Sequence, residues 1–243
     1  MITDAWERYI RSDEPSPERH LLFATNDVYE PDVDFSYGIP SIEYSNKCFP
    51  HFLFDSWPET GISNYQTSFD AMVDAGALPP VDTRVFWRGA LTNSFRATAC
   101  TLAKDHPDRM DFQLMKWNRT DPSNLTAHTP TYVPMTRQCS YRVLVDLGAG
   151  GFSARLPLLF ASGRPVILLE RHCEAWFYWD MKPWVHYIPS TEAGLLEAVN
   201  WSHDHPKESE IIGKQGQAYA KEHLTYEAVI RRCADLLRGS CTL

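Results

Sequence analysis

The sequence lacks the marks of several protein classes. No apolar run approaches the length of about 18 residues that a membrane-spanning helix needs. The first ten residues hold no basic stretch followed by an apolar one, so no secretory signal is seen. The six cysteines include no C-x-x-C pair, and G-x-S-x-G, the nucleophile turn of α/β-hydrolases, is absent. We therefore expect a cytoplasmic protein with reduced thiols and no membrane span.

Basic residues are scarce relative to acidic ones. The chain carries 23 Lys and Arg against 31 Asp and Glu, a formal net charge of −8. This balance argues against a broadly basic surface, so no nucleic-acid partner is expected, although a small anion can still bind where cations gather locally. Hydrophobic residues make up 44% and charged residues 22%, as in ordinary soluble globular proteins. At 243 residues, the chain has room for one large domain or two small ones.

Apolar runs and helical patterns alternate along the chain. The runs typical of buried strands are 20–26, 39–45, 84–87, 110–117, 141–147, 165–169 and 184–189. Helical spacing is found at 63–75, 92–103, from residue 154 onward, and at 192–201, 206–223 and 226–238. This alternation predicts an α/β fold with parallel strands. Residues 121–137 are rich in Pro, Thr and Ser, and we interpret them as a linker between two α/β halves.

A glycine-rich turn is the strongest local signal of a binding site. The string VDLGAGGFSAR at 145–155 runs from an expected strand through glycines into an expected helix. Backbone N–H groups in such a turn can approach a phosphate, and an arginine in the first helical turn can bind it through two hydrogen bonds. The candidates for phosphate contact are Gly150, Gly151, Phe152, Ser153 and Arg155. The alternative is a tight strand–helix turn that binds nothing.

Taken alone, DLGAGG at 146–151 resembles the first motif of S-adenosylmethionine-dependent methyltransferases. Under that resemblance, Glu170 at the end of the next strand would bind the ribose. The position of the motif argues against it, because only 92 residues follow Gly151 and they contain two expected strands and then helices. A methyltransferase needs several more strands after this motif. Methyl transfer is the alternative function that this motif predicts.

From residue 141 to residue 238 the chain resembles glycosyltransferase family 90, which includes capsule-associated xylosyltransferases and protein O-glucosyltransferases. The resemblance is carried by YRVLVD at 141–146, FSARL at 152–156, FASG at 160–163, MKPWVHYIP at 181–189 and GKQGQAYAKEHL at 213–224. The string KPWVHYIP, which follows an aromatic cluster, is the most specific of these.

Two upstream segments extend the resemblance. FWRGALTNSFR at 86–96 resembles a family segment whose Ser and final Arg contact the nucleotide diphosphate. Arg96 matches that Arg and Thr92 matches a Thr of the segment, whereas Ala90 stands in place of the Ser. ATNDVY at 24–29 resembles the strand end that carries the family's catalytic Asp. Asp27 is therefore the expected base, although Asn26 replaces the Arg that usually precedes it.

The resemblance implies a GT-B fold, in which two Rossmann-like domains face a cleft. We therefore expect an N-terminal domain at 1–125 that holds the acceptor and the base, and a nucleotide-sugar-binding domain at 126–243 whose last helix crosses back. The resemblance also implies an inverting transfer that needs no metal or other cofactor. The expected donor is UDP-xylose, or secondly UDP-glucose, and the expected acceptor is a hydroxyl of a glycan or a protein.

Two weaker motifs rest on residue chemistry alone. Asp55, Trp57 and Glu59 combine carboxylates with an aromatic ring, as sugar-binding sites do, and an ordinary surface loop explains them equally well. Asp32 and Asp34 form a D-x-D pair of the kind that binds manganese in other glycosyltransferases, but their Pro- and Asp-rich surroundings favour a loop.

Overall fold

The computed structural model describes residues 1–10, 21–24, 30–40, 42–116, 131–148, 153–171 and 173–241. The α-helices are α1 Ile2–Ala5, α2 Tyr65–Ala77, α3 Phe95–Asp105, α4 Met135–Gln138, α5 Leu156–Ala161, α6 Leu195–Asp204, α7 Pro206–His223 and α8 Tyr226–Cys241. The strands are β1 Asp82–Gly89, β2 Met110–Leu114, β3 Tyr141–Asp146, β4 Val166–Leu169 and β5 Ile188–Ser190. Shorter turns are the π-helical η1 Trp6–Ile10 and the 3-10 helices η2 Ile42–Lys47, η3 Phe52–Phe54 and η4 Pro58–Thr60.

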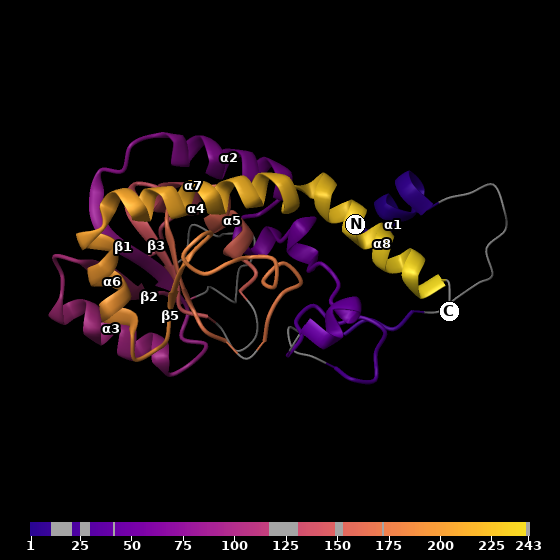
Figure 1. Cartoon of the computed structure of the whole chain (residues 1–243), viewed down its shortest axis with the longest axis horizontal. Helices are drawn as coiled ribbons and strands as arrows, with labels where there is room; N and C mark the ends of the chain where they lie inside the picture. Colours follow the sequence, from indigo (N-terminus) through magenta and orange to yellow (C-terminus); the bar gives the residue numbers. More distant parts are fainter. Residues whose placement is uncertain are drawn as a thin grey trace.

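The five strands form one parallel sheet in the order β2-β1-β3-β4-β5. Figure 1 shows this sheet among the surrounding helices. This confirms the α/β fold with a parallel sheet.

The expected division into domains 1–125 and 126–243 falls between β2 and β3, yet β1 pairs directly with β3, for instance Val85 with Val143. The sheet therefore crosses that boundary, and the described residues form one sheet where two Rossmann-like halves were expected.

The strands expected at 20–26 and 39–45 are not found in the described residues. Phe23 makes only an isolated bridge to Phe35, and residues 42–47 form the 3-10 helix η2. Prolines at positions 31, 40 and 50 punctuate this region. Pro40 lies inside the run 39–45, and because proline lacks the N–H that a strand ladder needs, it disfavours a strand there.

Side chains of the central strands alternate between two cores. Phe86 of β1 and Leu144 of β3 face one side, where the core is completed by α2, α5 and part of α7. Val85 and Trp87 of β1 and Val143 of β3 face the other side, with α3 and α6. Burying each large apolar side chain contributes about 1.5–3 kcal/mol, so these two cores supply most of the driving force for folding. The period of two residues also fixes the register of each strand.

Glycines allow α2 and α7 to pack closely on the turn that joins α5 to β4. A Cβ at Gly76 of α2 would lie 1.6 Å from the carbonyl oxygen of Ser162, and one at Gly213 of α7 would lie 2.5 Å from that of Gly163. Both separations are far below van der Waals contact. The two helices are thus held on residues 162–165 by contacts that only glycine permits.

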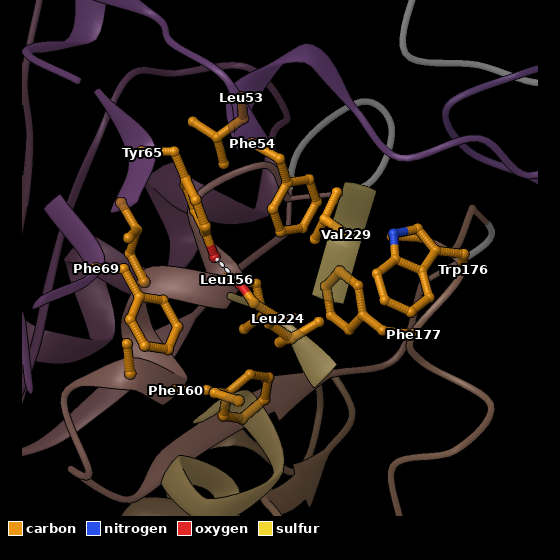
Figure 2. Close-up of a cluster of buried hydrophobic side chains, with 14 of the residues drawn as sticks. Leu53, Phe54, Tyr65, Phe69, Leu156, Phe160, Trp176, Phe177, Leu224 and Val229 are labelled. Carbon is orange, nitrogen blue, oxygen red and sulfur yellow. Dashed lines mark hydrogen bonds between the residues drawn. The ribbon is translucent and has the colours of Figure 1, made fainter. Parts of the chain in front are cut away.

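Helix α8 runs beyond the layers of the sheet and packs beside α1 and η1 (Figure 1). Tyr226 Oη donates to Asp4 Oδ2 at 2.8 Å, and Glu227 accepts hydrogen bonds from Arg8 and Tyr9. Where α7 gives way to α8, the Tyr65 hydroxyl donates to the carbonyl of Leu224 at 2.6 Å within a cluster of aromatic and aliphatic side chains (Figure 2). No helix in the described part of the chain is both long and apolar enough to span a membrane.

Candidate functional site

A cavity of about 280 Å³ lies where β1 and β3 end side by side. From β1 the chain crosses to β2 on one side and then returns to β3 on the other, so the carboxyl ends of β1 and β3 mark the point where the strand order reverses. In open parallel sheets the crevice at this point is the usual ligand site. Four parts of the chain line the cavity: the end of β1 and the residues that follow β1 and β2, the residues after β3, the region around η3 and η4, and the region around α4. In that order they are Arg88, Gly89, Ala90, Thr92, Arg96 and Met115; Ser153, Ala154 and Arg155; Leu53, Trp57, Thr60 and Ile62; and Tyr132, Val133, Met135 and Gln138.

Two arginines brace the loops that follow these strands. Arg96, in the first turn of α3, donates to the carbonyl of Ala90 at 2.7 Å and reaches across to the carbonyl of Gly148 after β3. Arg155, just before α5, donates in the opposite direction to the carbonyl of Arg88 in β1 at 2.7 Å. Each guanidinium therefore joins its own loop to the neighbouring strand, which fixes both groups at the edge of the cavity.

The indole of Trp87 supports both guanidinium groups. The Cζ atoms of Arg96 and Arg155 lie 5.2 and 5.9 Å from its ring centroid, within the range of cation–π attraction. The same ring explains Gly89 two residues later, because a Cβ there would lie 2.5 Å from the indole. The FWRG string thus builds a platform for two cations at the end of β1.

A fully buried carboxylate lies behind the arginines. Asp146 ends β3; its Oδ1 accepts the N–H of Gly148 at 2.8 Å and lies 3.3 Å from Nη2 of the buried Arg171. Burial alone would raise the pKa of Asp146, but the charges of Arg171 and Arg155 outweigh it, with a contribution from the Ser153 hydroxyl, and hold that pKa at about 2. Asp146 is therefore ionised at all ordinary pH values.

The positive charge at the cavity exceeds this one carboxylate. Asp146 acts on both Arg96 and Arg155, but it is also the ion-pair partner of Arg171. Burial and the neighbouring charge of Arg155 lower the pKa of Arg96 to about 10, so it stays cationic at neutral pH. Its Nε is buried and has no hydrogen-bond partner among the residues that the structure describes. An unsatisfied buried donor is costly, and an anion that accepts from it would remove that cost.

The ionisation of Asp146 makes the free energy of unfolding depend on pH in the acid range. Its pKa is lower in the folded state than the value of about 3.9 in an unfolded chain, so the unfolded state takes up the proton first as pH falls. The stabilisation is complete above about pH 5 and is lost as the pH falls toward 2, with a total of about 2 kcal/mol. Urea denaturation across this range should show the loss. The loss should be smaller in a variant in which Asp146 and Arg171 are replaced together by Asn and Met, where Asp82 and Asp111 keep their lowered pKa values. An equal acid dependence in both proteins would contradict the assignment.

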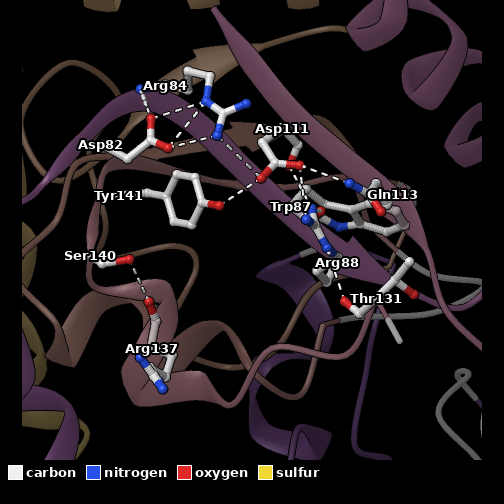
Figure 3. A network of polar contacts seen from close by, with 10 residues as sticks. All are labelled: Asp82, Arg84, Trp87, Arg88, Asp111, Gln113, Thr131, Arg137, Ser140 and Tyr141. Carbon is white, nitrogen blue, oxygen red and sulfur yellow. Dashed lines mark hydrogen bonds and ion pairs between the residues drawn. The ribbon is translucent and has the colours of Figure 1, made fainter. Parts of the chain in front are cut away.

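Arg88, which sequence reasoning passed over, is a positioning residue under the cavity. Its guanidinium donates to the carboxylate of Asp111 in β2 at 2.8 Å and to the carbonyl of Thr131 at 3.0 Å (Figure 3). Asp111 also accepts the Tyr141 hydroxyl at 2.6 Å, so β1, β2 and β3 share one polar network. The FWRG string contains Arg88, but its partner lies in a different strand, and no local pattern pairs the two.

The structure brings five of the residues expected from sequence to one cavity: Thr92, Arg96, Ser153, Arg155 and Trp57. Asp27, Gly150, Gly151 and Phe152 lie outside the described residues. The helix expected from residue 154 begins at Leu156 and has six residues.

The weaker candidates have other surroundings. Asp55 is exposed and does not line the cavity, and its carbonyl accepts the N–H of Tyr65 at the start of α2. Glu59 lies in η4, and its side chain is not described. In the D-x-D pair, Asp34 accepts the backbone N–H of Leu22 at 2.8 Å, which is a turn contact.

Comparison with known proteins gives one family and several relatives. The model of Glycosyl transferase family 90 matches residues 14–242. Protein O-glucosyltransferase 2 of Danio rerio is 29% identical over 178 residues, covering 68% of this chain and 34% of the relative. The O-glucosyltransferase rumi homolog of Anopheles gambiae is 26% identical, with coverages of 71% and 46%. Protein O-glucosyltransferase 1 of Homo sapiens is 26% identical over 220 residues, with coverages of 84% and 55%.

The chain thus spans between a third and just over half of the length of these relatives. Among solved structures, Anabaena Alr3699/HepE in complex with UDP-glucose aligns with a TM-score of 0.41 and 13% identity, over 70% of this chain and 44% of that one. The family model covers nearly the whole sequence, including the strings at 86–96 and 141–189 that form the cavity and its supports. The chain belongs to glycosyl transferase family 90.

Proposed function

We propose that this chain is a glycosyltransferase that takes its sugar from a UDP-sugar and binds the diphosphate in the cavity between β1 and β3. The observation that carries the proposal is the pair Arg96 and Arg155, fixed by opposing hydrogen bonds at the cavity and not neutralised by Asp146. Two fixed guanidinium groups suit a diphosphate, because each can donate to two phosphate oxygens. Family membership supplies the reaction class.

The reaction we propose is a single inverting displacement. A base, for which Asp27 is the candidate, takes the proton from the acceptor hydroxyl while that oxygen attacks the anomeric carbon. The bond from that carbon to the β-phosphate oxygen breaks, and UDP leaves with the electron pair. Negative charge grows on the departing diphosphate, and Arg96 and Arg155 would stabilise it without a metal ion. The backbone at Gly150, Gly151 and Phe152 is proposed to add further donors.

The substrates are proposed from the relatives' names together with the sequence. Those names describe O-glucosyltransferases, which favours glucose as the transferred sugar and leaves xylose as the second candidate. They also favour a protein hydroxyl as acceptor beside the glycan expected from sequence. For the architecture, we propose that the sheet is the nucleotide-binding part of a GT-B type enzyme and that Trp57 in the opposite cavity wall faces the sugar.

A ligand panel in a thermal denaturation assay tests the proposal. A ligand at about 100 times its Kd stabilises the folded state by about 2.7 kcal/mol, so UDP and UDP-glucose should raise the melting temperature clearly. UDP-xylose should give the same rise, because the diphosphate supplies the main contacts. S-adenosylmethionine should have no effect. A rise with S-adenosylmethionine and none with the UDP compounds would favour the methyltransferase alternative and overturn the proposal.

A further inference from the structure

A second cavity, of about 650 Å³, lies at the opposite edge of the sheet. It opens where β3 and β4 begin, between the end of α2, the turn at 162–165 and one face of α7 from Pro206 to Lys221. Since the first cavity lies at the carboxyl ends of the strands, the two sites are separated by the length of the sheet. The charged side chains that line the second cavity are Arg142, Arg164, Lys207, Lys214, Lys221 and Glu210.

Arg142 is the least satisfied of these groups. It projects from β3, and its Nε and Nη2 atoms are shielded from solvent without a hydrogen-bond partner among the described residues. Partial burial lowers the pKa of Arg142, and within the described ranges no carboxylate offsets that effect. A guanidinium held in this way costs stability unless an acceptor is supplied from outside the chain.

Arg164 is held quite differently. Its Nε donates to the carbonyl of Cys139 at 2.9 Å and its Nη2 donates to the carbonyl of Leu78, so its planar group is fixed against the cavity wall. The close contacts of Gly76 and Gly213 with the same turn fix α2 and α7 on either side. These walls of the cavity are therefore preformed, whereas the side chains that cover Arg142 Nε and Nη2 must shift before a ligand reaches them.

The second cavity is lined mainly by cations, whereas the chain as a whole has a negative net charge. Of its five cations, Lys214 is paired with Glu210 at 2.6 Å, while Lys207 and Lys221 form no ion pair with the described residues. The chain as a whole carries −8. A local excess of cations in an acidic protein attracts anions to that one place.

We propose that this second cavity binds a small phosphate-bearing anion, with Arg142 as the central donor and Lys207 and Lys221 at the rim. Phosphate suits the arrangement because its several oxygens can accept from a planar guanidinium and from ammonium groups at the same time. The site is independent of the cavity between β1 and β3, and it stands whether or not that cavity binds UDP.

Amide NMR of the full chain tests this directly. Inorganic phosphate is titrated at constant ionic strength, and the amide signals of Gly163 and Arg164 report the second cavity while those of Gly89 and Ala90 report the first. We expect saturable shifts at Gly163 and Arg164. Arg142→Met should weaken this binding at least tenfold, and the matched control Arg84→Met, which removes an arginine paired with Asp82 in β1, should leave it unchanged.

Stability separates a binding role from a structural one. If Arg142 serves a ligand, Arg142→Met should keep or raise the melting temperature in phosphate-free buffer, because it removes a partly buried cation whose Nε and Nη2 have no partner among the described residues. A marked fall would show a structural role and would count against the proposal. The surface variant Lys207→Gln/Lys221→Gln leaves the core intact, and it should weaken phosphate binding several-fold.

The remaining outcomes are equally decisive. Shifts confined to Gly89 and Ala90, a linear response without saturation, or equal binding by Arg142→Met would each overturn the proposal. A parallel titration with glucose 6-phosphate distinguishes the source of the phosphate. Tighter binding than inorganic phosphate identifies an organic phosphate ester, and equal binding identifies the free ion.

Discussion

Replacing Asp146 by asparagine is expected to lower the free energy of unfolding by about 3–5 kcal/mol. The side chain is fully buried, and it is the ion-pair partner of Arg171, of which only 7% is exposed. Asparagine keeps the shape but removes the charge, which leaves a guanidinium buried beside two further arginines. Urea denaturation at pH 7 measures the loss directly, and the transition of the variant should move to a much lower urea concentration.

A double variant separates the charge from the packing. Asp146→Asn together with Arg171→Met removes both members of the pair, so the buried cation is no longer left without a partner. Replacing a whole buried pair by residues of similar volume is often close to neutral, and most of the lost stability should return. A single variant that loses less than about 1 kcal/mol, within the range of exposed pairs, would show that this ion pair is not effectively buried.

Arg96→Ala is expected to reduce the turnover number of sugar transfer by about 10²–10³-fold, the usual effect of deleting one donor to a charge that develops in the transition state. Affinity for UDP should fall as well, because the guanidinium also holds the loop carbonyls of Ala90 and Gly148 in place. Steady-state transfer from UDP-glucose and calorimetric titration with UDP measure the two effects. Arg96→Lys keeps the charge and should recover part of the rate.

Two companion variants make this result specific. Arg84→Ala removes an arginine at the amino end of the same strand, which pairs with Asp82 and lies 3.7 Å from Asp111. It should leave both rate and affinity nearly unchanged, because Asp111 keeps its closer contacts with Arg88 and Tyr141. Asp27→Asn should abolish transfer but spare UDP binding, since a base acts on the acceptor. If Arg96→Ala binds UDP and transfers sugar as well as Arg84→Ala does, then the cavity between β1 and β3 is not the donor site.

The sheet could be predicted from sequence because its signals are local. β1, β3 and β4 are short apolar runs next to helical patterns, and α7 coincides with the expected range 206–223. Helix α2 was likewise expected, at 63–75, but the residues before it could not be predicted in the same way. Their apolar and aromatic side chains resemble strands, but their backbone is organised by isolated bridges such as that between Ile39 and Glu174, which lie far apart in the sequence.

The residues of the site also differ in whether their signal is local in the sequence. Arg96 and Arg155 could be found because each belongs to a short string whose residues act together. The pairing of Asp146 with Arg171 depends on β4 lying beside β3, and that of Arg88 with Asp111 depends on β2 lying beside β1. Arg142 carries no signal at all, because the absence of a partner becomes visible only when every neighbour is known.

The pairing of α8 with α1 and η1 has a consequence for the order of folding during synthesis. The hydrogen bond between Tyr9 and Glu227 joins residues 218 positions apart. At about 5–20 residues per second, a ribosome needs roughly 10–45 s to make the chain between them. The sheet can form before α8 exists, whereas Ala5, which is fully buried in the finished protein, has no α8 to pack against until then. Residues 1–10 are thus made before the sheet, yet they are among the last to reach their native contacts.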